Sequence, residues 1–229
     1  MTTPASPLRP RDDLPFCQLD GGLIFLDVQN DAYFRLSARL ERAFLAYLGG
    51  VPCDEADVAR LVQRRILVDA SASADHTPTP VTVARSAMEQ VADPSELPLL
   101  DVLETFWITV STRLQLRLRR LDHILGSLDA YRRSKAPLAR QTPGRPIEPS
   151  LRNAAHAFLR ARRYVPIETR CLLDSLSMTR YLARRGHHVC IVFGVTEDPF
   201  AAHCWIQTGD LLLNDAIGNV ETYTPIWTF

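Results

Sequence analysis

Hydrophobic and polar positions in the first 70 residues follow two periods. Short alternating runs, separated by the turn-forming stretches 20–22 and 29–31, occupy residues 16–19, 23–28 and 32–36. Apolar residues then recur at helical spacing over 39–48, after Ser37, and again after Asp54. The sequence therefore predicts a meander of three strands followed by short helices, a winged-helix-like module at residues 15–70. The proline-rich residues 1–14 are predicted to be a disordered N-terminus.

The middle of the chain shows mainly helical spacing. Residues 71–82 are small, polar and broken by proline, which is typical of a linker. A short helix is predicted over 83–91 and a long one over 99–131, and the four prolines within 134–149 indicate a second loop. Ser150 then starts a helix that runs to about residue 164. We interpret this region as a scaffold for the last third of the chain.

The last third of the chain alternates between one helix and several short strands. Thr169 is the expected N-cap of a helix that starts near Cys171 and ends at Gly186. The apolar run 189–195 predicts a central strand, and 202–207 and 211–213 predict a hairpin that ends at Asp215. Residues 83–229 are thus expected to form one domain with helices packed on an antiparallel sheet, and the fold class is α+β.

Composition excludes several classes of function. Among 229 residues, Lys and Arg balance Asp and Glu at a formal net charge of +0, so no overall field attracts nucleic acid or a membrane surface. Five cysteines without a CxxC pair argue against a disulfide scaffold and against a zinc site. The most apolar helical stretch contains Asp101 and Glu104, and the N-terminus lacks a signal-peptide pattern. We expect a cytoplasmic protein without nucleic-acid or membrane partners.

Candidate chemistry concentrates in the last third. Cys171 lies in the first turn of a helix, where unpaired N–H groups and the helix dipole favour a thiolate. Strand alternation puts His203 on the face opposite to Cys204, and the hairpin returns Asp215 beside His203. A nucleophile beside a base that is oriented by an acid is the general form of a catalytic triad. This chemistry needs neither a metal nor another cofactor.

The amino-acid sequence of this segment resembles that of the transglutaminase-like, papain-like cysteine peptidases of lasso-peptide biosynthesis, the leader peptidases called B proteins. The matching pieces are Cys171-Leu172, Arg185-Gly186, Val192-Phe193-Gly194-Val195, Pro199-Phe200, Ala202-His203-x-Trp205 and Asn214-Asp215. The resemblance implies that Cys171 is the nucleophile, His203 the general base and acid, and Asp215 the orienting acid. Cys204 departs from the family, which usually has alanine there, and we expect its side chain to point away from the site with little effect.

The stretch LIFLDVQNDAYFRLS and the helix after it resemble a PqqD-like recognition element for ribosomally made and modified peptides. The resemblance implies that a precursor's leader peptide adds as a strand along Ala32, Tyr33, Phe34, Arg35 and Leu36. Recognition element and peptidase in one chain match the fused form of these proteins. An ATP-dependent, asparagine-synthetase-like cyclase is then the implied partner, and any need for ATP belongs to it, because the chain has no P-loop pattern.

Two other functions stay open at this point. The same triad serves an acyltransferase or amidase of the transglutaminase or arylamine N-acetyltransferase type, in which only the acceptor of the thioester differs. A winged-helix protein that binds peptides without catalysis is the third hypothesis. For the oxyanion hole, the backbone N–H of Cys171 is one candidate donor, and the sequence names no second one.

Overall fold

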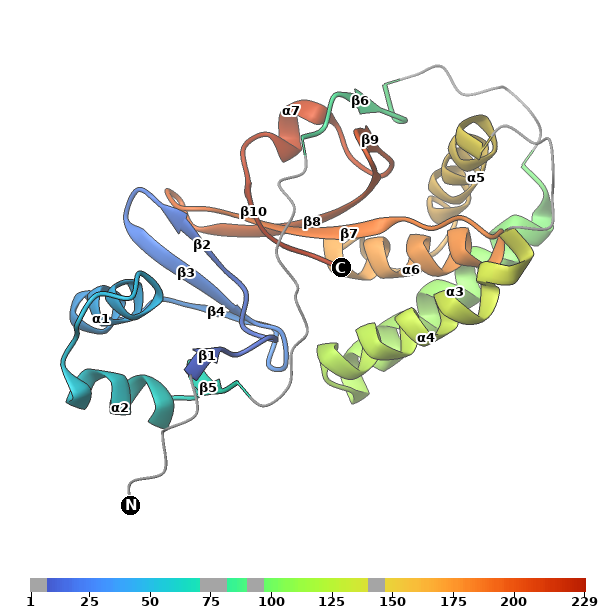
Figure 1. Ribbon diagram of the computed structural model, residues 1–229. Helices are drawn as coiled ribbons and strands as arrows, with labels where there is room; N and C mark the ends of the chain where they lie inside the picture. The colour runs from blue at the N-terminus through green and yellow to red at the C-terminus, as the bar shows by residue number, and fades with distance from the viewer. Residues whose placement is uncertain (1–7, 71–81, 90–96, 140–146) are drawn as a thin grey trace. The chain divides into compact units, whose positions relative to one another are not determined.

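The computed structural model describes residues 8–70, 82–89, 97–139 and 147–229. The chain divides into two compact units, Met1–Pro78 and Thr79–Phe229 (Figure 1). Both contain helices and strands, so the protein is a mixed α and β protein.

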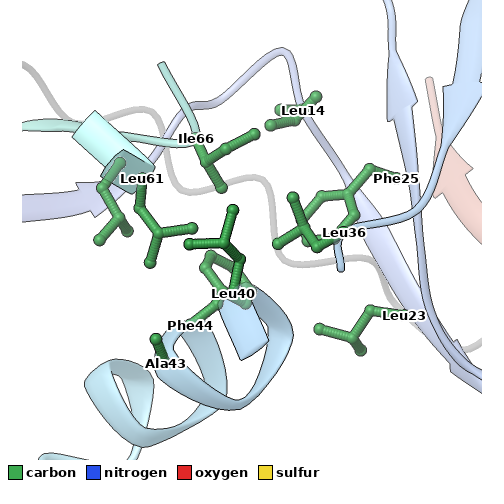
Figure 2. Packing of buried hydrophobic residues seen from close by; sticks show 10 residues of the cluster. Leu14, Leu23, Phe25, Leu36, Leu40, Ala43, Phe44, Leu61 and Ile66 are labelled. Carbon is green, nitrogen blue, oxygen red and sulfur yellow. The ribbon is translucent and has the colours of Figure 1, made fainter. Parts of the chain in front are cut away.

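Unit 1 is built on the expected meander. Strands β2 (Phe16–Leu19), β3 (Gly22–Asp27) and β4 (Ala32–Phe34) pair antiparallel in that order. Helices α1 (Ala38–Leu48) and α2 (Glu55–Gln63) follow, and the Asp54 side chain caps α2 by accepting a hydrogen bond from the Ala56 N–H at 2.9 Å. Figure 2 shows side chains of the sheet and both helices meeting in one core. Phe25 lies at its centre, with the rings of Phe34 and Phe44 each 5.3 Å from its own. Aromatic burial from three elements fixes this unit.

The N-terminal prolines do not exclude regular structure. Residues 8–14, where the sequence predicts disorder, include strand β1 (Leu8–Pro10), which pairs antiparallel with β5 (Leu67–Asp69). Leu14 is 3% exposed and belongs to the core. Proline is tolerated here because β1 pairs on one side only, as edge strands do. Residues 1–7 lie outside the described part of the chain.

Unit 2 has a sheet of five strands in the order β10-β7-β8-β9-β6. Its long central pair is β7 (Cys190–Thr196) and β8 (Ala201–Thr208), and all neighbours are antiparallel except β6 and β9. The other strands are β6 (Arg85–Ser86), β9 (Leu211–Leu212) and β10 (Thr224–Thr228). Helix α6 (Cys171–Arg184) packs on β7 and β8, and α3, α4 and α5 pack on α6 (Figure 1). Helix α3 spans Leu99–Leu118, α4 spans Leu121–Ala139 and α5 spans Ile147–Arg162, while the short α7 spans Ile217–Val220.

Three helix predictions for the middle region were wrong in detail. The long helix is interrupted at Arg119, which is extended with φ −132° and ψ 154°, so α4 can bury a separate apolar face (Leu121, Ile124, Leu125, Leu128). Helix α4 continues to Ala139 and α5 begins at Ile147, so both ends of the predicted loop 134–149 are helical. The residues between the two helices, 140–146, lie outside the described part of the chain. No helix occupies 83–89: this segment pairs with β9 instead. At Arg119 and at residues 83–89, tertiary packing overrode local propensity.

Among the helices of the described ranges, none is both long and apolar enough to cross a bilayer. Most of the predicted linker, 71–81, lies outside the described residues.

Candidate active site

Helix α6 starts at Cys171 itself. Its N-cap is Arg170, not the expected Thr169, and no side chain of the cap residue bonds to the first turn. Instead the Asp174 carboxylate reaches back and accepts a hydrogen bond from the Arg170 N–H at 3.2 Å. The buried guanidinium of Arg162 donates to Asp174 at 2.7 Å and so joins α5 to this first turn. Cys171 therefore stands on a rigid helix start, where free N–H groups favour a negative sulfur.

His203 and Asp215 form the second part of the site. The distance between His203 Nε2 and Asp215 Oδ2 is 2.5 Å. Asp215 also accepts hydrogen bonds from the Ala216 N–H at 2.8 Å and from the Asn219 amide at 3.0 Å. Burial would raise the pKa of Asp215, but these hydrogen bonds lower it, so the carboxylate stays charged. Since Nε2 is engaged by Asp215, Nδ1 is the ring nitrogen left for the Cys171 thiol.

The sulfur of Cys171 is stabilised as a thiolate. The thiol of Cys204 donates a hydrogen bond to it; burial acts in the opposite sense, and His203 and the Cys204 backbone N–H add further hydrogen bonds, which together lower the pKa of Cys171 to about 4. Burial would lower the pKa of His203, but Asp215 and the Cys171 thiolate outweigh it and raise that pKa to about 9. Near neutral pH the site thus holds a thiolate beside an imidazolium, which is the reactive form of a thiol nucleophile.

The position of Cys204 differs from the expectation that its side chain points away. Strand alternation does put His203 and Cys204 on opposite faces of β8, but β9 pairs with β8 only at Gln207 and Thr208. At Cys204 the edge of β8 faces α6, because the Cys204 carbonyl accepts a hydrogen bond from Ser175, and the Cys204 side chain is itself a hydrogen-bond partner of the Cys171 sulfur. The cysteine at this position therefore contacts the nucleophile.

Two polar residues for which no role was predicted from the sequence join α6 to this edge. Ser175, one turn after Cys171, donates to the Cys204 carbonyl at 3.2 Å and accepts from the Asn214 amide at 3.0 Å. The Asn214 carbonyl oxygen accepts the Ile206 N–H at 2.8 Å. These bonds satisfy backbone groups of β8 on the edge that faces α6 and join the helix of Cys171 to the strand of His203. In the sequence, a serine four residues after the cysteine was the signal that could have indicated this contact between α6 and β8.

Aromatic rings fix the orientation of His203. Its ring centroid lies 5.1 Å from that of Tyr223 and 6.1 Å from that of Trp205. Gly194 pairs with His203 across the strands, and a Cβ there would lie 2.7 Å from Trp205 Cζ3. Glycine is required at this position because the indole occupies the space of a side chain.

The segment around β6 also holds the loop of Asp215 in place. Ser86, which is 2% exposed, donates to the backbone oxygen of Asp215 at 2.7 Å. Glu89 accepts the Ile217 N–H at 3.2 Å, and Arg85 forms a two-pronged ion pair with Asp210. This role was not predicted, since the spacing over 83–91 favoured a short helix.

A cavity of about 200 Å³ lies beside the first turn of α6, and Cys171 is not among the residues that line it. The lining residues are the apolar Phe158, Leu159 and Met178 and the polar or charged Arg162, Arg163, Thr169, Asp174 and Asn214. Thr169 and Asp174 flank Cys171 in the sequence, and the negative charge of Cys171 acts on Asp174. Within the described residues no set of three His, Cys, Asp or Glu side chains is placed to hold a metal ion.

The residues expected to bind a leader lie in unit 1, at an edge of its sheet. Ala32 is exposed and Tyr33 is partly buried, and β4 pairs with β3 alone among the described strands. Phe34 stacks on Phe25 and Leu36 is 7% exposed, so both side chains belong to the core. Any recognition along this strand therefore uses its backbone and the side chains of the outer face.

Comparison with known proteins gives one family match, and it covers most of unit 2. A model of the transglutaminase-like superfamily matches residues 108–228, which is just over half of the chain and includes Cys171, His203 and Asp215. No curated protein and no solved structure matches the chain significantly. That superfamily generally has a catalytic fold like that of cysteine proteases, and a helix-borne cysteine beside a strand-borne histidine is what the geometry shows. The chain belongs to the transglutaminase-like superfamily.

Proposed function

We propose that the chain is a cysteine peptidase that removes the leader from a lasso-peptide precursor. The observation that carries this proposal is the arrangement of Cys171, His203 and Asp215, in which the low pKa of the thiol and the high pKa of the imidazole favour the ion pair. The resemblance of the segment 171–215 to the lasso leader peptidases supports the choice of substrate.

The chemistry follows from the ion pair. The Cys171 thiolate attacks the carbonyl carbon at the junction of leader and core, and the backbone N–H of Cys171 is a candidate donor to the oxyanion. His203 Nδ1–H protonates the leaving amine, which becomes the new N-terminus of the core, while the leader stays bound as a thioester. The neutral imidazole then takes a proton from water, hydroxide attacks the thioester, and the leader leaves as a carboxylate with Cys171 restored. Asp215 holds the ring through Nε2 in both steps.

Unit 1 would act as the recognition element, a winged-helix-like, PqqD-like module. Strand β4 is an edge strand, and main-chain hydrogen bonds to an added leader strand would supply affinity without a deep pocket. Binding the leader in the same chain raises the effective concentration of the junction at Cys171. The released amine is the group that an ATP-dependent, asparagine-synthetase-like cyclase would consume, so that enzyme is the proposed partner. All five cysteines are free, which fits a reducing cytoplasm.

The test is incubation of a candidate precursor with wild type, Cys171→Ala and the matched control Cys190→Ala, followed by mass spectrometry. We expect separate leader and core from wild type and the control, and intact precursor from Cys171→Ala. Leader removal by Cys171→Ala would refute the mechanism. A mass gain on an amine acceptor, or a deamidation, in place of cleavage would show an acyltransferase or amidase with the same thioester chemistry.

A further inference from the structure

Helix α3 presents six large apolar side chains to solvent. Leu99, Leu100, Leu103, Trp107, Leu114 and Leu118, here called the leucine stripe, are 47% to 77% exposed. The face that packs on α5 and α6 instead carries Thr105, Ile108, Thr109 and Thr112. A surface helix ordinarily has the reverse arrangement, because apolar burial stabilises its packing. The stripe is therefore a surface that needs a partner.

The size of the stripe matches a protein interface. The exposed surface area of these six residues is on the order of 700 Å². A standard protein interface buries about 800 Å² of surface on each partner. The largest apolar patch on a typical monomer is about 300–600 Å². Tryptophan is also among the residue types that are enriched in such contacts.

The spacing of the stripe indicates what that partner is. Leu100, Leu103, Trp107, Val110 and Leu114 follow gaps of three and four residues, the pattern that packs one helix against another. From Leu103 to Leu114 the gaps are four, three and four residues, so this spacing is the same when it is read backwards. In an antiparallel pair, Leu103 falls level with Leu114 of a second copy, and Trp107 with its Val110. A patch that is complementary to itself in this way is what two-fold symmetry requires.

Charge is compatible with this pairing. Asp101 and Glu104, beside the start of the stripe, already form ion pairs with Arg185, and Glu104 also with Arg184. The exposed Arg117 lies at the other end of α3, so the antiparallel pair brings it near Asp101 of the second copy. Antiparallel α3 helices also align their dipoles favourably.

We propose that the leucine stripe is the contact surface of a two-fold homodimer, in which α3 of one copy packs antiparallel on α3 of another. The proposal is independent of the peptidase function. It requires only that the full chain associates through residues 99–118.

Light scattering after gel filtration at micromolar concentration tests the proposal. We expect about twice the chain mass of 25.7 kDa for wild type and the monomer mass for Leu103→Glu and for Leu114→Glu. Leu48→Glu is the matched control: this leucine on α1 is 43% exposed, close to the 47% of Leu103, and should leave the dimer intact. Circular dichroism verifies that each variant is folded. A monomeric wild type, or a dimer that survives both α3 substitutions, would overturn the proposal.

Disulfide cross-linking tests the register. The double variant Leu103→Cys/Leu114→Cys should oxidise to a covalent dimer, because the two positions meet across the axis. Leu103→Cys alone should not, since its two copies lie roughly 16 Å apart along antiparallel helices, too far for a disulfide. Equal cross-linking of the single and double variants would reject the antiparallel register. Protection of Trp107 fluorescence from acrylamide in a monomer would show that the same chain covers the stripe, and would also overturn the proposal.

Discussion

The contact between Cys204 and the nucleophile has a measurable consequence. Substituting Cys204→Ala removes the thiol that donates to the Cys171 thiolate but keeps the backbone N–H that also donates. The thiolate then loses one of its hydrogen bonds while the neutral thiol is little affected. We therefore expect the pKa of Cys171 to rise from its value of about 4.

The size of the effect follows from the strength of such a bond. A hydrogen bond to a charged group contributes about 1.5–3 kcal/mol, and a thiol is a weak donor, so the lower value applies. That value corresponds to roughly one pH unit. At pH 4 the thiolate fraction then falls from about one half to about one tenth, and alkylation should slow roughly fivefold. Above pH 7 the thiolate is nearly complete in both proteins, and the rates should agree.

The assay needs no substrate. The rate of iodoacetamide alkylation is measured from pH 3 to pH 8, and mass spectrometry follows the peptide that contains Cys171, since the chain has five cysteines. Cys204→Ser keeps a donor and should show a smaller change, and Cys190→Ala, whose residue is exposed, should show none. A Cys204→Ala profile that superimposes on wild type would refute the contact. The Cys204 side chain would then point away from Cys171, as strand alternation predicts.

Three further results are expected. Asp215→Asn removes the charge that raises the pKa of His203, so the alkaline limit of turnover should fall from about pH 9, while an unmoved limit would contradict the assigned pair. Gly194→Ala puts a Cβ 2.7 Å from the Trp205 ring and should cost about 1–3 kcal/mol in urea denaturation; full stability would show that the indole can move. Ser86→Ala loses the bond to the Asp215 backbone and should cost about 0.5–1.5 kcal/mol and slow turnover, unlike the exposed control Ser134→Ala. Turnover equal to that of the control would exclude a positioning role for Ser86.

The meander of unit 1 and the hairpin of unit 2 could be predicted because their signals are local. Turn residues and alternating apolar positions lie within a few residues of each other, and pairing follows from adjacency, as for β2 with β3 and β7 with β8. The predicted boundaries of α5 and α6 were close to the observed ones for the same reason.

Partners far apart in the sequence could not be predicted. Strand β1 forms because residues 67–69 come back to pair with it, and β6 forms because β9 offers an edge more than 100 residues later. Neither segment has strand signals of its own. The break at Arg119 likewise serves packing on α6, since no proline or glycine marks it.

The sequence by itself determined the order of elements, the neutral charge and the three residues Cys171, His203 and Asp215 as candidates, because helix and strand periods place each on a known kind of element. Only the tertiary structure decided that Cys204 donates to the nucleophile, that Ser175 and Asn214 join α6 to β8, and that Ser86 holds the Asp215 loop. It also decided which face of α3 is exposed. The physical reason is that hydrogen bonds and burial depend on distances between elements, and these are set by packing of the whole domain.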